Sequence, residues 1–186
     1  MATTGTTQTS SSSTPPLPRI GEFYRGKSVL VTGATGFLGK CLLERLLRDC
    51  GDLKKIYVLV RPAKDKTPAQ RMEEILQDSL FDLIRKQEAI AQASLSRSSS
   101  TDSLHKDGGG AAAGAGRRQQ VSFEDKVVAV AADLAEPQMG VKDEEMMEEM
   151  RENVSIILHM AATVNFNEKL DISLATNVVS VQNLIK

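Results

Sequence analysis

Three glycines at three-residue spacing are the residues of this sequence whose positions most clearly predict chemistry. They lie in the segment TGATGFLG, residues 32–39. The first glycine of such a turn permits a sharp reversal, the second lets an anion approach the backbone, and the third lets a helix pack closely on a sheet. Backbone N–H groups followed by a helix N-terminus bind phosphate. The spacing predicts a nucleotide site comprising Gly33, Thr35, Gly36, Phe37, Leu38 and Gly39.

A different phosphate loop, G-x-x-x-x-G-K-[ST], is suggested by Gly39 and Lys40 but is not matched. Its first glycine falls on Ala34, and Cys41 stands where the pattern needs a hydroxyl group for magnesium. The sequence therefore argues against a P-loop nucleotidase. The spacing G-x-x-G-x-x-G also differs from the G-x-G-x-x-G of many dehydrogenases.

A basic residue, Arg61, directly follows the apolar run Ile56–Val60, which is typical of a buried strand. An NAD-specific site places Asp or Glu about 20 residues past the glycine loop, where it binds the ribose 2′-hydroxyl. A carboxylate would repel a 2′-phosphate, whereas a guanidinium group binds it through two hydrogen bonds. Arg61 therefore favours NADP over NAD, the alternative being an exposed loop arginine.

Two further strand ends carry candidate cofactor contacts. Asp133 and Leu134 follow the apolar run 127–132, and a carboxylate there can accept a hydrogen bond from the adenine amino group; the alternative is a turn or N-cap aspartate. His159 ends the run 154–158 and is expected to be structural, since no metal-ligand pattern surrounds it. Small residues after it leave room for ribose and nicotinamide, namely Ala161, Ala162 and Thr163.

A parallel sheet is needed to bring these residues together. Apolar runs predict strands at 28–31, 56–60, 127–132 and 154–158, and helical spacing predicts helices between them and over 170–186. Alternating strands and helices are typical of α/β folds, in which the carboxyl ends of parallel strands share one edge. The sequence predicts a Rossmann-like, doubly wound parallel sheet that is incomplete at its C-terminal side.

The composition suits one soluble α/β domain. The chain has 186 residues, a formal net charge of −1 and a hydrophobic fraction of 41%. This balanced charge gives no electrostatic reason to expect a nucleic-acid partner, and no apolar run is long enough to span a bilayer. Cys41 and Cys50 point to opposite faces of one predicted helix and cannot form a disulfide, which fits a reducing, intracellular compartment.

Two segments of biased composition divide the chain. Residues 1–19 are rich in Ser and Thr and lack the apolar core of a signal peptide, so a disordered tail is expected. Residues at about 93–120 contain SLSRSSSTDS and GGGAAAGAG, which predict a low-complexity insertion. The domain is expected over residues 20–186, interrupted by this insertion.

These motifs resemble the extended short-chain dehydrogenase/reductase family. The longer phrases EFYRGKSVLVTGATGFLGKCLLERLLR, KKIYVLVRP and HMAATVNFNEKL resemble more closely the N-terminal part of fatty acyl-CoA reductases, over residues 20–87 and 121–186. The resemblance implies that a long-chain fatty acyl-CoA is reduced to a primary alcohol, with NADPH supplying both hydrides. It also implies a tetrad of Asn, Ser or Thr, Tyr and Lys, with Asn177 at the asparagine position.

The tyrosine and lysine of that tetrad should be four residues apart. Here Tyr24 is followed four residues later by Ser28, and Tyr57 by Arg61. The chain is therefore expected to end before the catalytic pair and to be inactive alone, either as a fragment or as a truncated isoform.

Two other interpretations of the function stay open. One is the thioester-reductase domain of a carboxylic-acid reductase or peptide synthetase, and the other is a non-catalytic nucleotide-binding protein. The resemblance further implies attachment to the peroxisomal or endoplasmic-reticulum membrane, only through a missing C-terminal region.

Overall fold

A computed structural model describes residues 19–98 and 122–185, and in them the chain forms a single parallel sheet. The spatial order of the strands is β3-β2-β1-β4. Their bounds are Ser28–Thr32 for β1, Lys55–Val60 for β2, Val127–Ala131 for β3 and Val154–His159 for β4. The Rossmann-like α/β fold predicted from the sequence is confirmed.

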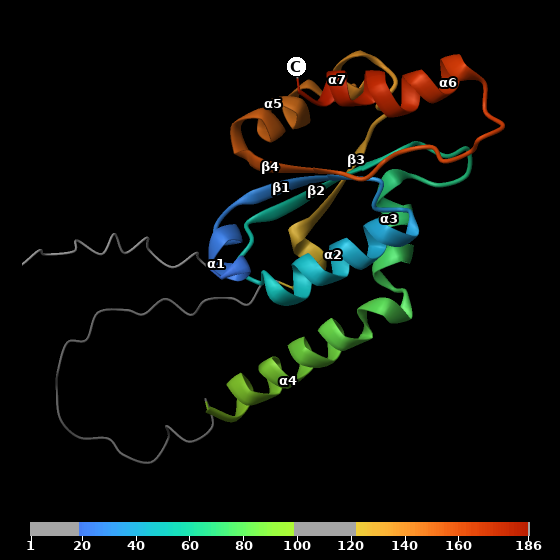
Figure 1. Ribbon diagram of the computed structural model, residues 1–186. Helices are drawn as coiled ribbons and strands as arrows, with labels where there is room; N and C mark the ends of the chain where they lie inside the picture. Colours follow the sequence, from blue (N-terminus) through green and yellow to red (C-terminus); the bar gives the residue numbers. More distant parts are fainter. Residues whose placement is uncertain (1–18, 99–121, 186) are drawn as a thin grey trace, which may run out of the picture.

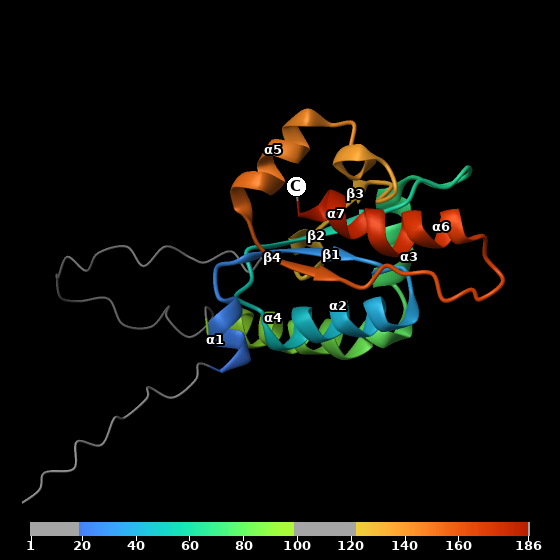
Figure 2. The same ribbon diagram turned by 45° about the horizontal axis from the view of Figure 1, so that its top comes forward.

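Helices cover both faces of this sheet (Figures 1 and 2). One face carries α2 (Phe37–Asp49), α3 (Pro68–Leu76) and α4 (Asp82–Ser98). The other carries α5 (Glu144–Asn153), α6 (Leu170–Leu174), the π-helical turn η4 (Ala175–Val179) and α7 (Ser180–Leu184). Shorter elements are α1 (Ile20–Tyr24) and the 3-10 turns η1 (Ser79–Phe81), η2 (Glu124–Lys126) and η3 (Pro137–Gly140).

Strand β1 is buried along its whole length because it lies inside the sheet with helices above and below. Val29 and Val31 point into the core under α2 and α3, whereas Leu30 points into the core under α5 and α7. Two hydrophobic layers explain why this strand appears in the sequence as a continuous apolar run.

Local capping sets where helices begin. At α3, the hydroxyl of Thr67 accepts a hydrogen bond from the Gln70 amide at 3.2 Å, and the Gln70 side chain accepts one from the Thr67 amide at 2.9 Å. This capping box, with Pro68 in the first helical turn, accounts for the start of α3 at Pro68.

Helix α4 differs from the sequence expectation. It continues to Ser98, past position 93 where the low-complexity insertion was expected to begin. Its last turns contain AIAQASL, and Ala, Gln and Leu have high helix propensity. The rest of that insertion and residues 1–18 of the expected tail lie outside the described residues, and Arg19 is the N-cap of α1.

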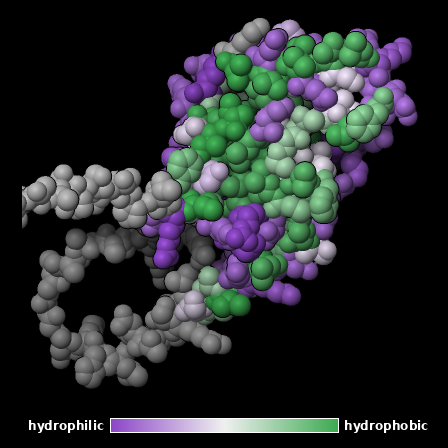
Figure 3. Space-filling view, viewed as in Figure 1, coloured by the Kyte–Doolittle hydropathy of each residue, from purple (hydrophilic) through white to green (hydrophobic). Residues whose placement is uncertain are grey.

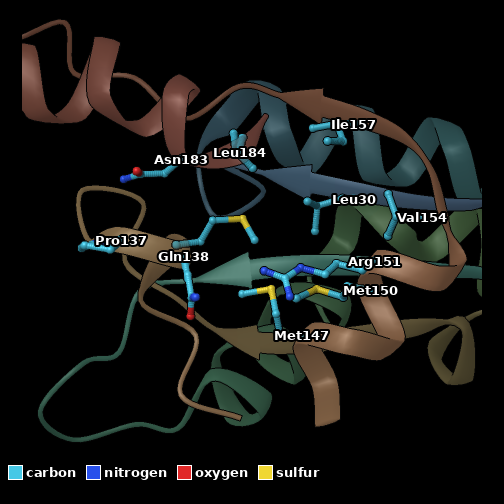
Figure 4. A pocket seen from close by; sticks show the side chains of 11 residues that line it. Leu30, Pro137, Gln138, Met147, Met150, Arg151, Val154, Ile157, Asn183 and Leu184 are labelled. Carbon is cyan, nitrogen blue, oxygen red and sulfur yellow. The ribbon is translucent and has the colours of Figure 1, made fainter. Parts of the chain in front are cut away.

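A cavity of about 630 Å³ lies over β1 and β4, between α5 and α7 (Figure 4). Its apolar lining includes Leu30, Met147, Met150 and Leu184, and Ile157 of β4 is 43% exposed beside it. Hydrophobic side chains accordingly gather in the middle of the face seen in Figure 3. None of the helices at residues 19–98 and 122–185 is both long and apolar enough to cross a membrane.

Candidate cofactor-binding site

The glycine turn joins β1 to α2 at the carboxyl edge of the sheet. Gly33 has a φ of +71°, and its carbonyl accepts a hydrogen bond of 3.0 Å from the Gly36 amide. Gly36 is the N-cap of α2, with extended backbone angles. A Cβ on Gly39 would lie 2.1 Å from the Gly33 oxygen and 2.5 Å from the Ala34 Cα, so only glycine permits α2 to pack on this turn.

Gly33 also packs against the end of β4. A Cβ at Gly33 would lie 2.7 Å from the Ala161 nitrogen and 2.7 Å from the Met160 carbonyl carbon. The glycine turn and the predicted small residue Ala161 are therefore neighbours, although 128 positions separate Gly33 from Ala161 along the chain.

Thr32 holds these two strand ends together. Its side chain is fully buried, and its Oγ1 accepts hydrogen bonds from the amides of Met160 at 3.1 Å and Ala161 at 3.2 Å. The same oxygen lies 2.8 Å from Nδ1 of His159. Because both amides donate to the hydroxyl, its own proton must be donated to Nδ1, which leaves the ring N–H on Nε2. Sequence reasoning missed Thr32, although its place just before the first glycine was available as a signal.

His159 therefore has a structural role in the site, and burial lowers its pKa from 6.5. The unfolded chain takes up the proton of His159 at higher pH than the folded chain. The contribution of His159 to the free energy of unfolding is therefore fully present above about pH 6.5 and is lost as the pH falls below that value. We expect the thermal midpoint to be a few degrees lower at pH 5 than at pH 7, as measured by circular dichroism.

His159→Asn is the matched variant, because its amide oxygen can accept the Thr32 proton and does not titrate. The part of the pH dependence that is due to His159 should disappear in this variant. An unchanged difference between pH 5 and pH 7 would assign that difference to other groups.

Arg61 and Asp133 come together from the ends of β2 and β3. Nη2 of Arg61 lies 3.3 Å from Oδ1 of Asp133, and this oxygen also accepts a hydrogen bond of 3.2 Å from the Ala135 amide. The Arg61 side chain is 63% exposed and thus accessible to a ligand. Arg71, on α3, donates to the Arg61 carbonyl oxygen. Sequence reasoning missed Arg71, since only the tertiary fold brings α3 to this point.

A hollow of about 930 Å³ adjoins this pair, lined on one side by Arg61 and Pro62 and on another by Ala132 and Asp133. Leu134 follows directly, and its carbonyl accepts a hydrogen bond from the Asn183 side chain at 3.0 Å. The candidate residues for 2′-phosphate and adenine therefore share one concave surface.

Asn177 lies in the π-helical turn η4 and contacts the loop after β4. Its Oδ1 accepts a hydrogen bond of 2.8 Å from the Thr163 amide, and its Nδ2 donates to the Thr163 carbonyl at 3.1 Å. One amide side chain thus holds both backbone groups of Thr163. Single π-helical turns inside helices often occur at functional sites.

Two other candidates, Phe37 and Leu38, lie where their backbone amides, rather than their side chains, are the groups suited to an anion. Phe37 and Leu38 are 81% and 68% exposed in the first turn of α2, while the buried Thr32 and the turn glycines shape the surface beside them. Lys40 forms an ion pair of 3.3 Å with Asp78. In the described part of the chain, no group of three or more His, Cys, Asp or Glu side chains is placed to hold a metal ion.

Comparison with known proteins identifies an NAD-binding family. The NAD-binding family described as male sterility protein matches residues 31–186. Fatty acyl-CoA reductase 1 of Gallus gallus is 37% identical over 166 residues, and that of Homo sapiens is 36% identical; each alignment covers 89% of this chain and 26% of the relative. The chain thus spans about a quarter of these relatives.

A solved structure is similar as well. The reductase domain of a non-ribosomal peptide synthetase from Mycobacterium tuberculosis has a TM-score of 0.55 and 27% identity, covering 87% of this chain and 30% of that one.

Proposed function

Since the chain belongs to the fatty acyl-CoA reductase family, through the NAD-binding domain described as male sterility protein, we propose that it forms the NADPH-binding portion of an enzyme that reduces long-chain fatty acyl-CoA to a primary alcohol. The observation that carries the cofactor choice is Arg61 beside Asp133 at the edge of an open hollow. A guanidinium group there suits a 2′-phosphate, and a carboxylate suits the adenine amino group.

The glycine turn fits a pyrophosphate. A Cβ on Gly36 would meet only the Gly33 oxygen, at 3.4 Å, so the space above this residue is open. Amides of the first turn of α2 and the helix N-terminus favour an anion at this place. Ala161, Ala162 and Thr163 would border the ribose and nicotinamide, and the bound nicotinamide would supply the hydride.

The proposed reaction consumes two hydrides and two protons and releases CoA, so it needs a proton donor at the substrate oxygen. Tyr57 cannot serve, because it is fully buried and its hydroxyl donates to Glu149 at 2.7 Å. Burial, followed by that hydrogen bond, raises the pKa of Tyr57 to about 12. The family resemblance implies a Tyr-x-x-x-Lys pair as this donor, and the 186 residues contain no such pair.

The test is to measure NADPH binding and palmitoyl-CoA reduction with the 186-residue chain. We expect NADPH to bind and no alcohol to form, since loss of one oxyanion donor alone lowers rates by about 10²–10³. Binding is followed by nucleotide fluorescence, and the product is identified directly. Absence of nucleotide binding would contradict the cofactor assignment, and alcohol formation would contradict the placement of the donor.

A thioester-reductase domain that acts on a carrier-bound acyl chain is the second candidate. It is favoured by the similarity to the synthetase reductase domain, at 27% identity, although the fatty acyl-CoA reductases are closer at 36–37%. In a full-length protein, comparing kcat/KM for free acyl-CoA and for a carrier-protein thioester separates the two. Membrane attachment in the peroxisome or endoplasmic reticulum belongs to the first proposal, and microscopy of the full-length protein tests it.

A further inference from the structure

The loop that follows β3 has an unusual backbone. Gln138, Met139 and Gly140 are consecutive residues with φ of 53°, 59° and 62°. This left-handed region is unfavourable for side chains with a Cβ, so neighbouring contacts must hold the turn. One such contact joins the turn to the site, because the Asp133 amide donates to the Met139 carbonyl at 2.8 Å.

Asn183 contacts the segment just before this turn. It lies on α7, and Figure 4 shows its side chain above Pro137 and Gln138. Its Nδ2 donates to the carbonyl of Leu134 at 3.0 Å and to the carbonyl of Glu136 at 2.9 Å. Both hydrogens of the amide nitrogen are therefore used on the two residues that flank Ala135, whose own amide donates to the Asp133 carboxylate at 3.2 Å.

The same helical segment thus holds the loops after two different strands. Asn177 binds both backbone groups of Thr163 after β4, and Asn183 binds two carbonyls after β3. The site for nicotinamide and the site for adenine, as assigned above, are each fixed by one asparagine of this segment.

We propose that Asn183 is a positioning residue for the adenine end of the cofactor site, acting through the loop 134–136 on the Asp133 carboxylate. This inference rests on the proposed NADPH-binding function. A loop that is already ordered loses less conformational entropy when the ligand binds, so releasing it weakens binding without removing any direct contact.

The variant that tests this is Asn183→Asp, which keeps the shape of the side chain but places an oxygen opposite two carbonyl oxygens. Gln182→Glu is the matched control, because it adds the same charge at an exposed neighbouring position of α7. Asn183→Ala removes both donors without adding charge, and it replaces the Asp variant if that variant does not fold.

Affinity is measured for NADPH and for adenosine 2′,5′-bisphosphate, which carries only the adenosine half. We expect Asn183→Asp to weaken both ligands by about the same factor, on the order of tenfold, with Gln182→Glu within twofold of the unmodified chain. Equal losses show that the effect lies at the adenosine half. A loss confined to NADPH, or unchanged affinity for both, overturns the proposal.

Hydrogen exchange provides a readout that needs no cofactor. In Asn183→Ala, the amides of Asp133 and Glu136, which donate to the Met139 and Asp133 carbonyls, should exchange faster, while those of the glycine turn stay unchanged. Unchanged exchange at 133–141 overturns the inference. If the unmodified chain binds neither ligand, the proposed function fails and this inference fails with it, whereas binding that ignores Asn183 defeats the inference alone.

Discussion

Gly39→Ala is expected to prevent the chain from folding around its nucleotide site. The new methyl group would lie 2.1 Å from the Gly33 oxygen, 2.5 Å from the Ala34 Cα and 2.7 Å from the Gly33 carbonyl carbon. All three are backbone atoms, so no side chain can rotate away and α2 must move off the sheet. We expect a loss of at least about 3 kcal/mol in the free energy of unfolding, measured by urea denaturation.

Gly36→Ala separates folding from binding at the same turn. Its methyl group would meet one atom at 3.4 Å, and its φ of −83° is open to alanine, so the free energy of unfolding should fall by no more than about 1 kcal/mol. The methyl group would occupy the space assigned to the pyrophosphate, and NADPH binding should be lost.

Gly51→Ala is the neutral control, because nothing lies within 4 Å of its Cβ position. If Gly39→Ala remained as stable as Gly51→Ala, the close packing of α2 on the turn would be disproved. If Gly36→Ala bound NADPH like the unmodified chain, the pyrophosphate would have to lie elsewhere.

Arg61→Asp is expected to reverse the cofactor preference. It would remove the charge-assisted hydrogen bond that we propose Arg61 makes to a 2′-phosphate, and would place a carboxylate there instead. In the unmodified chain Arg61 forms an ion pair of 3.3 Å with Asp133. NADPH binding should weaken by about 2–4 kcal/mol, or about 30- to 1000-fold. NADH should bind at least as well as before, because an acidic residue here can bind the ribose hydroxyls.

Lys64→Asp is the matched control, since it makes the same change of charge at an exposed position three residues away. Dissociation constants for NADPH and NADH are compared in both variants. If Lys64→Asp changed the NADPH to NADH ratio as strongly as Arg61→Asp, the preference would come from general electrostatics rather than from a bound 2′-phosphate. An unchanged ratio in Arg61→Asp would make Arg61 an ordinary loop residue.

Local patterns in the sequence predicted most of the strands and helices and the glycine turn of the candidate site. The strand that contains Val29 and Val31 has a continuous apolar run because both faces are covered, and the Thr67-Pro68 pair fits the start of α3 because capping depends on adjacent residues. The glycine spacing likewise predicted the turn, since a φ of +71° at Gly33 and the close contact at Gly39 are requirements on the residue itself. The helical end of α4 at 93–98 was missed, because a Ser- and Ala-rich composition does not distinguish helix from linker.

The contacts that hold the site come from the tertiary structure alone. Thr32 meets Met160 and Ala161, and Asn183 meets Leu134 and Glu136, across separations of 47 to 129 positions. Such pairs leave no periodic signal, because each depends on which strands are neighbours and on the register between them. The order β3-β2-β1-β4 sets the neighbours, and the parallel pairing of each strand sets the register, so the sheet determines which polar side chains meet at its carboxyl edge.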